Sequence, residues 1–155
     1  MHQMIFVNLP VADPAASRRF FDSLGYGFNE EMCDDERCVA VELGPNIYAM
    51  LLRRDFFDSF HDGARAADTP AAPSAPEALL CLSADDRDHV DRLTQAAVAG
   101  GGRVVRTQDE GFMYGVSYED LDGHIWEIMW MDLAGARAAG AFPGEESAMT
   151  DAMPS

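Results

Sequence analysis

Basic residues are scarce in this sequence. Its 155 residues include 11 Lys and Arg against 27 Asp and Glu, which gives a formal net charge of -16. Nucleic acids and anionic membranes bind positively charged patches, so neither is expected as a partner. The N-terminus has no charged segment followed by a long apolar run, and no apolar stretch is long enough to span a bilayer. We therefore expect an acidic cytoplasmic protein.

Cysteine is also rare, and its spacing matches no familiar motif. Cys33, Cys38 and Cys81 form no CxxC pair. Cys33 and Cys38 flank an expected turn where they could face each other, although reduced thiols are the usual state in a cytosolic protein. GxSxG, HExxH and phosphate-loop motifs are absent, so no common catalytic signature is present. His124, which follows a turn glycine, is expected in an exposed loop.

The apolar pattern predicts one order of elements twice. A strand at 4–11 precedes a helix that Asp13 caps and Gly25 ends, and strands follow near 28–33, 38–43 and 47–52. The second copy begins with a strand at 79–83. Asp85 or Asp86 then caps a helix that runs through residue 98, and strands follow at 104–108, 113–120 and 124–130. Two strand–helix–three-strand units indicate an internal duplication, and hence an α+β fold.

The composition between these copies indicates a linker. Residues 66–78 are rich in Ala and Pro and have no apolar periodicity. We therefore expect one domain at 1–132, with module one at 4–53, a linker at 54–78 and module two at 79–132. The spacing of Phe56, Phe57 and Phe60 is that of a short helix. These side chains are expected to pack at the junction of the modules, in preference to covering the cleft as a lid. The tail at 133–155 is low in complexity, has a short helix near 134–139 and is assigned no function.

The last expected hairpin contains an unusual carboxylate. Its two arms flank the turn at 120–123, and strand alternation separates two faces of the second arm. One face carries Trp126, Ile128 and Trp130, and the other carries Glu127, Met129 and Met131. A carboxylate within an apolar strand is costly unless it is paired or binds a ligand. Glu127 is therefore either a functional group or a carboxylate that bonds to a neighbour such as a tyrosine hydroxyl.

Three segments give the chain a family resemblance. FVNLPVAD near the start, the following RRFFDSLGY and DLDGHIWEI near the end resemble the vicinal oxygen chelate superfamily of glyoxalases, bleomycin resistance proteins and extradiol dioxygenases. The resemblance implies two tandem βαβββ modules that form a curved mixed sheet around a cleft, commonly completed in a homodimer. Enzymes of that superfamily hold a divalent metal in the cleft, with ligands from the first and last strand of each module.

When the family's four metal-ligand positions are carried over to this sequence one by one, only one of them holds a ligand. Glu127 matches the glutamate of the last strand, whereas Phe6, Ala49 and Leu79 occupy the other three positions. These three side chains have no donor atom, and a small hard cation needs several oxygen or imidazole ligands. We therefore expect no metal site of the family type and no cofactor, with a divalent metal as the alternative.

Three functions remain open from the sequence, and the third of them is a dimeric interaction module with no small ligand. The first is a metal-independent small-molecule-binding protein of the bleomycin-resistance type, with an aromatic cleft that has polar anchors. The expected ligand-binding residues are Tyr48, Met50, Tyr114, Tyr118 and Glu127, with Trp126 and Trp130 as further candidates for the cleft lining. If the face of Tyr114 and Tyr118 is the cleft, both hydroxyls lie beside Glu127. The alternative is a glyoxalase-like lyase or isomerase, or a dioxygenase-type enzyme, in which Glu127 is a metal ligand or general base.

Overall fold

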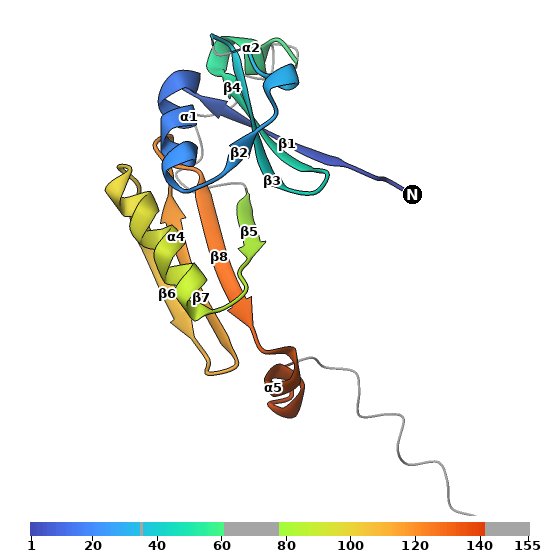
Figure 1. Cartoon of the computed structure of the whole chain (residues 1–155), viewed down its shortest axis with the longest axis vertical. Helices are drawn as coiled ribbons and strands as arrows, with labels where there is room; N and C mark the ends of the chain where they lie inside the picture. Colours follow the sequence, from blue (N-terminus) through green and yellow to red (C-terminus); the bar gives the residue numbers. More distant parts are fainter. Residues whose placement is uncertain (35, 61–77, 142–155) are drawn as a thin grey trace, which may run out of the picture.

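The computed structural model describes residues 1–34, 36–60 and 78–141. The first module contains β1 (Ile5–Val11), α1 (Pro14–Ser23), β2 (Gly27–Phe28), a 3-10 helix η1 (Glu30–Met32), β3 (Cys38–Gly44), β4 (Ile47–Arg53) and α2 (Arg54–Asp58). The second contains β5 (Leu79–Ser83), α4 (Arg87–Ala99), β6 (Arg103–Asp109), β7 (Met113–Glu119), β8 (Ile125–Met131) and α5 (Leu133–Ala138). Figure 1 shows the two modules one above the other. The expected α+β class with tandem βαβββ modules is confirmed.

Both modules have the same sheet topology. The strand orders are β1-β4-β3-β2 and β5-β8-β7-β6, so the first and last strands of each module are parallel neighbours. Among the described residues, no strand pairing joins the two sheets. β1 and β5 are therefore edge strands, and the eight strands of one chain form two open sheets.

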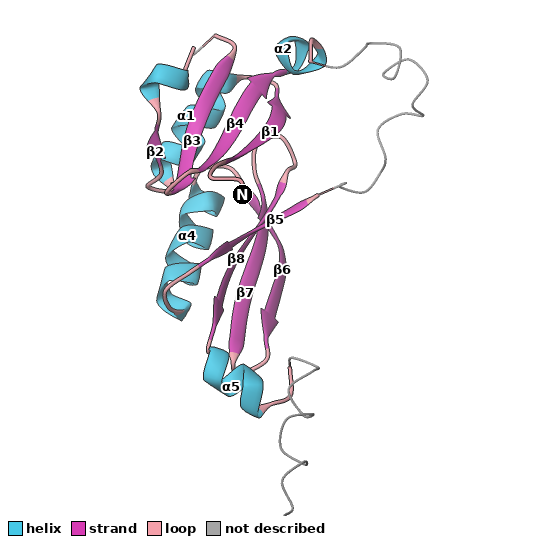
Figure 2. Ribbon diagram, turned by 90° about the vertical axis from the view of Figure 1, so that its right-hand side faces the viewer, coloured by secondary structure: helices cyan, strands magenta, loops and turns pink. Residues whose placement is uncertain are grey.

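One hydrophobic core extends across both modules. Helices α1 and α4 lie on the same side of the molecule in Figure 1. The rings of Phe20 and Phe21 in α1 reach the second sheet, with centroids 6.4 Å from Tyr118 and 5.3 Å from Trp126. Figure 2 looks onto the opposite face of the first sheet, with α1 behind the strands and α2 at its upper end. Within the described part of the chain, the helices thus cover one face of each sheet and leave the other face open.

The helix starts follow their capping residues. The Asp13 carboxylate accepts the amides of Ala15 and Ala16 at 2.9 and 3.2 Å, as expected for an N-cap. Asp86 is the cap of α4, since its carboxylate accepts the His89 amide at 2.6 Å. No described helix is long and apolar enough to cross a membrane.

Two expected segments differ in the structure. The strand expected at 28–33 ends at Phe28, because the Asn29 side chain accepts the Glu31 amide at 3.1 Å and starts η1. Helix α2 occupies the first residues of the expected linker at 54–78, and residues 61–77 lie outside the described residues. The module boundaries therefore stay a prediction.

Candidate ligand-binding face

Strand β8 divides its side chains between the core and the open face, as its alternation predicts. Trp126 and Ile128 are fully buried in the core, and Trp130 packs against that core. Glu127 and Met129 lie on the opposite face and are partly exposed. Trp126 and Trp130, candidates for the cleft lining, therefore lie on the core side of β8 and not on its open face.

Glu127 lies in a row of polar side chains that crosses the open face of the second sheet. Cys81 of β5 and Ser117 of β7 are its register partners on either side, and Arg106 of β6 pairs with Ser117. The Ser117 hydroxyl donates to Glu127 Oε2 at 3.3 Å, and the Cys81 thiol donates to Glu127 Oε1 at 3.7 Å. Glu127 thus has two weak donors, neither of them the expected tyrosine.

Cys81 is the exposed thiol of this row. Although the residue is exposed, partial desolvation by its surroundings, together with the neighbouring Glu127 carboxylate, raises the pKa of the Cys81 thiol. The thiol therefore stays protonated at neutral pH and serves as a hydrogen-bond donor to Glu127. Sequence reasoning missed both Cys81 and Ser117, although the register of the hairpin places Ser117 directly opposite Glu127.

Tyr114 and Tyr118 lie on the face opposite to Glu127. Tyr118 is fully buried in the core, and burial raises the pKa of its hydroxyl, which has no hydrogen-bond partner among the described residues. The Tyr114 hydroxyl donates to Asp91 of α4 at 2.7 Å. The face of the two tyrosines is therefore not the cleft, and the condition under which both hydroxyls would lie beside Glu127 is not met. The intervening Val116 packs in the core, and side chains alternate along the strand.

The open face of the first sheet carries the other two expected ligand-binding residues. The rings of Phe6 and Tyr48 are stacked, with centroids 5.2 Å apart and an interplanar angle of 13°. Met50 pairs with Asn8 in the adjacent strand. Tyr48 and Met50 are partly exposed, so this face presents an aromatic and thioether surface with one amide.

The structure corrects one of the four positions at which the family's metal ligands were expected in this chain. Cys81, which pairs with Glu127, lies five residues before the helix cap Asp86, and Asn8, which pairs with Met50, lies five residues before Asp13. Met50 is therefore the counterpart of Glu127. Ala49, expected there, is fully buried on the helix-covered face. Aligning Ile47 with Ile125 by residue type shifts the register by one, which turns the strand over.

The corrected positions do not fit a hard divalent cation. Phe6 and Leu79 offer no donor atom, Met50 offers a thioether, and Glu127 offers the one carboxylate. Within the described ranges, no group of three or more His, Cys, Asp or Glu side chains is placed to share a metal ion. Hard cations prefer several oxygen ligands, so this donor set would hold such an ion weakly.

The turn from Asp120 to His124 joins the two modules. His124 Nε2 donates to the Pro10 carbonyl at 2.7 Å, and Asp122 Oδ1 accepts the Ala12 amide at 2.8 Å. The Ser17 hydroxyl adds a bond to Asp122 Oδ2 at 3.4 Å. His124 is thus partly buried between modules, and its expected place in an exposed loop is wrong.

Helix α2 borders a pocket at one end of the first open face. The pocket has a volume of about 380 Å³, and its lining includes Asn8, Met50, Phe56 and Phe60. The rings of Phe56 and Phe60 meet edge to face with centroids 5.1 Å apart, yet Phe60 remains 70% exposed. Phe60 thus lines the pocket and is not buried in a packed junction.

Comparison with known proteins places the fold. Residues 3–44 match the family model described as bleomycin resistance protein-like N-terminal, and no curated protein matches the chain. The chain is similar to a hypothetical protein from S. aureus, with 24% identity and a TM-score of 0.66 over 84% of this chain and 94% of that chain.

Two further solved structures show the same fold at lower identity. A glyoxalase/bleomycin resistance protein/dioxygenase family enzyme from Burkholderia phytofirmans PsJN has 17% identity and a TM-score of 0.69, over 82% of this chain and 97% of its own. A fosfomycin resistance protein from Mesorhizobium loti has 12% identity and a TM-score of 0.61, over 88% and 98%. The chain therefore has the glyoxalase/bleomycin-resistance fold of the vicinal oxygen chelate superfamily.

Proposed function

We propose that the open faces of the two sheets bind an amphipathic or aromatic small molecule without a metal ion, as in a bleomycin-resistance-type binding protein. The observation that carries this proposal is the stacked pair Phe6 and Tyr48 on an uncovered sheet face. Phe6 is 42% exposed, and a flat apolar ligand would shield such a surface from water. Glu127 on the second open face would supply the polar anchor.

A second copy of the chain would complete the binding cleft. Ile5 of β1 is 54% exposed and Leu79 of β5 is 65% exposed, and both lie on edge strands. Apolar edge strands are prone to pair with another chain, and pairing β1 of one copy with β5 of another would join two open faces. Light scattering tests the homodimer. We expect twice the mass of one chain, with dissociation in Leu79→Arg and none in Leu133→Arg on the distant helix α5.

Fluorescence titration with Nile red, a neutral flat amphipath, tests the binding face. We expect saturable binding that weakens in Phe6→Ser and Tyr48→Ser, because both changes remove aromatic surface. Val98→Ser is the control, since Val98 is an exposed apolar residue on helix α4. Equal binding by all four proteins would contradict the assignment of this face.

A cationic flat probe tests the role of Glu127. Proflavine binding is expected to weaken in Glu127→Gln, whereas Nile red binding should stay unchanged, because only the cation gains from the carboxylate. If both probes bind the variant as they bind the wild type, Glu127 is not part of the ligand site.

The enzyme alternative rests on the same carboxylate. Glu127 is partly exposed on the open face and accepts two hydrogen bonds, so a substrate proton could reach it. A lyase or isomerase with Glu127 as general base would show a pH–rate profile that disappears in Glu127→Gln. Unchanged turnover in that variant would remove the base assignment.

A further inference from the structure

Four sulfur-containing side chains gather around the pocket beside helix α2. Met32 comes from η1, Cys33 follows it, Cys38 begins β3, and Met50 lies in β4. All four line the same volume of about 380 Å³. This cluster is separate from Glu127, which lies on the other sheet.

Each thiol hydrogen-bonds to backbone in the segment that carries the other cysteine. Cys33 Sγ accepts the Ala40 amide at 3.3 Å, and the Cys38 thiol donates to the Met32 carbonyl at 3.4 Å. Ala40 lies two residues after Cys38 on the same face of β3, and its partner in β4 is Met50. The two thiols and the Met50 thioether therefore approach the pocket from adjacent positions.

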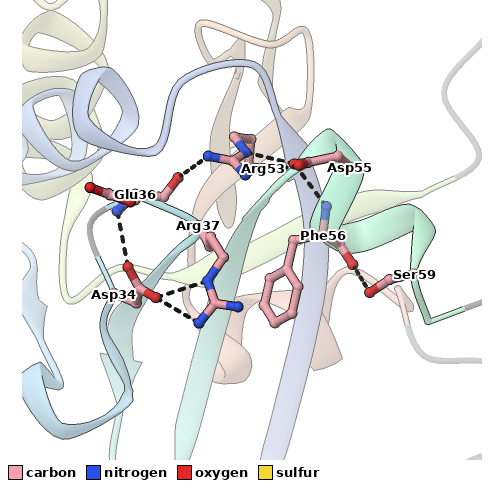
Figure 3. Close-up of polar contacts among 7 residues, drawn as sticks. All are labelled: Asp34, Glu36, Arg37, Arg53, Asp55, Phe56 and Ser59. Atoms are coloured by element: carbon pink, nitrogen blue, oxygen red, sulfur yellow. Dashed lines mark hydrogen bonds and ion pairs between the residues drawn. The ribbon is translucent and has the colours of Figure 1, made fainter.

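Asp34 and Arg37, which lie between the two cysteines in the sequence, form an ion pair. Arg37 Nε and the Asp34 carboxylate are 2.9 Å apart, and the Arg37 guanidinium lies 5.1 Å from the centroid of the Phe56 ring (Figure 3). Asp34 and Cys38 also exchange backbone hydrogen bonds of 2.9 and 2.7 Å. Asp34, Arg37 and Cys38 are thus joined by side-chain and backbone contacts next to the two thiols.

The donor chemistry selects a soft cation. Thiolate and thioether ligands favour ions such as Cu(I), whereas hard cations need oxygen ligands. The nearby Asp34 carboxylate is already paired with Arg37. We propose that this pocket binds one soft thiophilic cation of the Cu(I) class through the Cys33 and Cys38 thiolates, with Met32 or Met50 as a third ligand.

Binding would exchange protons for the cation. Each S–H bond loses its proton to solvent as the sulfur–metal bond forms, and no electron is transferred. Affinity therefore rises with pH, as for other thiolate sites.

Anaerobic titration of the reduced full-length chain with Cu(I), in competition with the chromophoric chelator bicinchoninate, tests this site. We expect one Cu(I) per chain, and an affinity at least about tenfold lower in Cys33→Ser and in Cys38→Ser, which is about 1.4 kcal/mol. Cys81→Ser is the matched control, since this third thiol lies on the other sheet and should not change the affinity.

Either of two results would overturn the proposal. One is a wild-type chain that takes no Cu(I) from the chelator, and the other is unchanged affinity in Cys33→Ser. If Cys38→Ser fails to fold because Cys38 is buried, the partly exposed Cys33 still provides the test. Met50→Leu separates the thioethers, since unchanged affinity in that variant assigns the third ligand to Met32. Nile red binding is measured in parallel on the same proteins. It shows whether the proposed ligand-binding face is present, independently of the outcome for Cu(I).

Discussion

Removing the Asp120 carboxylate should destabilise the fold through Trp126. Asp120 is buried at the turn before β8, and its Oδ2 atom accepts the Trp126 indole N–H at 3.0 Å. Its Oδ1 atom accepts the amides of Asp122 and His124 at 2.9 and 3.0 Å. In Asp120→Ala the turn amides can turn to water, but the fully buried indole N–H cannot.

The cost of leaving the buried Trp126 indole N–H without an acceptor sets the size of the effect. An unsatisfied buried donor costs ~1–3 kcal/mol, so we expect a loss of roughly 2 kcal/mol in the free energy of unfolding. For a chain of this length that corresponds to about 4–8 °C in Tm. Urea unfolding monitored by circular dichroism measures the loss. Asp88→Ala on the exposed side of α4 is the control, with a change within about 0.5 kcal/mol.

A double-mutant cycle isolates the hydrogen bond itself. In a Trp126→Phe background there is no indole N–H to satisfy, so Asp120→Ala should cost at least about 1 kcal/mol less than it does in the wild type. Equal costs in the two backgrounds would refute the assignment of the effect to this bond. A cost of Asp120→Ala below about 0.5 kcal/mol would refute it as well.

The pH dependence gives an independent check. Burial raises the pKa of Asp120 above its ordinary value of 3.8, against the lowering effect of its hydrogen-bond donors. The folded chain then binds a proton that the unfolded chain releases, so the contribution of this carboxyl group to stability is complete below pH 3.8 and declines as the pH rises through the folded pKa. The stability of wild type relative to Asp120→Asn should therefore be greatest in acid. A difference that grows with pH would contradict the raised pKa.

Three further predictions concern other contacts. Gly102→Ala should destabilise the chain by at least about 1 kcal/mol in urea unfolding, because the new Cβ would lie 2.7 Å from the Glu119 carbonyl oxygen. The Arg87 guanidinium lowers the pKa of Asp109 to about 2, so the stabilisation of wild type over Asp109→Asn should be present above pH 3.8 and vanish as the pH falls through 2. Asp86→Ala removes the N-cap of α4 and should cost about 1 kcal/mol in the same assay, whereas no change would reject the cap.

Local chemistry made much of the fold predictable. Asp13 and Asp86 mark the helix starts because a carboxylate satisfies free amides at that point, and alternation separates Trp126 from Glu127 on β8. The short β2 was not predicted, since Asn29 begins η1 with a single side-chain bond that competes with strand pairing.

The side of the sheet that the helices cover was harder to predict. Both faces of β7 and β8 are largely apolar, so periodicity identifies two faces but not which one is buried. The sequence therefore left open whether the face of Tyr118 is the cleft, and in the structure Ser117 lies beside Glu127 instead. That Met50 is the counterpart of Glu127 was not predicted, because the two modules were aligned by residue type. Counting residues from the helix cap in each module gives the correct alignment.

The motif that carries the resemblance most clearly serves folding in this chain. Asp120, Asp122 and His124 bond to the Trp126 indole, the Ala12 amide and the Pro10 carbonyl, so they fix β8 and the module junction. A chain that needs this turn will present the residue at position 127 on the open face whatever chemistry follows. The motif therefore predicts where Glu127 lies, and the side chains around the open faces decide what it can bind. The Cys81 thiol and the Ser117 hydroxyl bond to Glu127, and the stacked Phe6 and Tyr48 lie on the first sheet, an arrangement that supports the proposed ligand anchor.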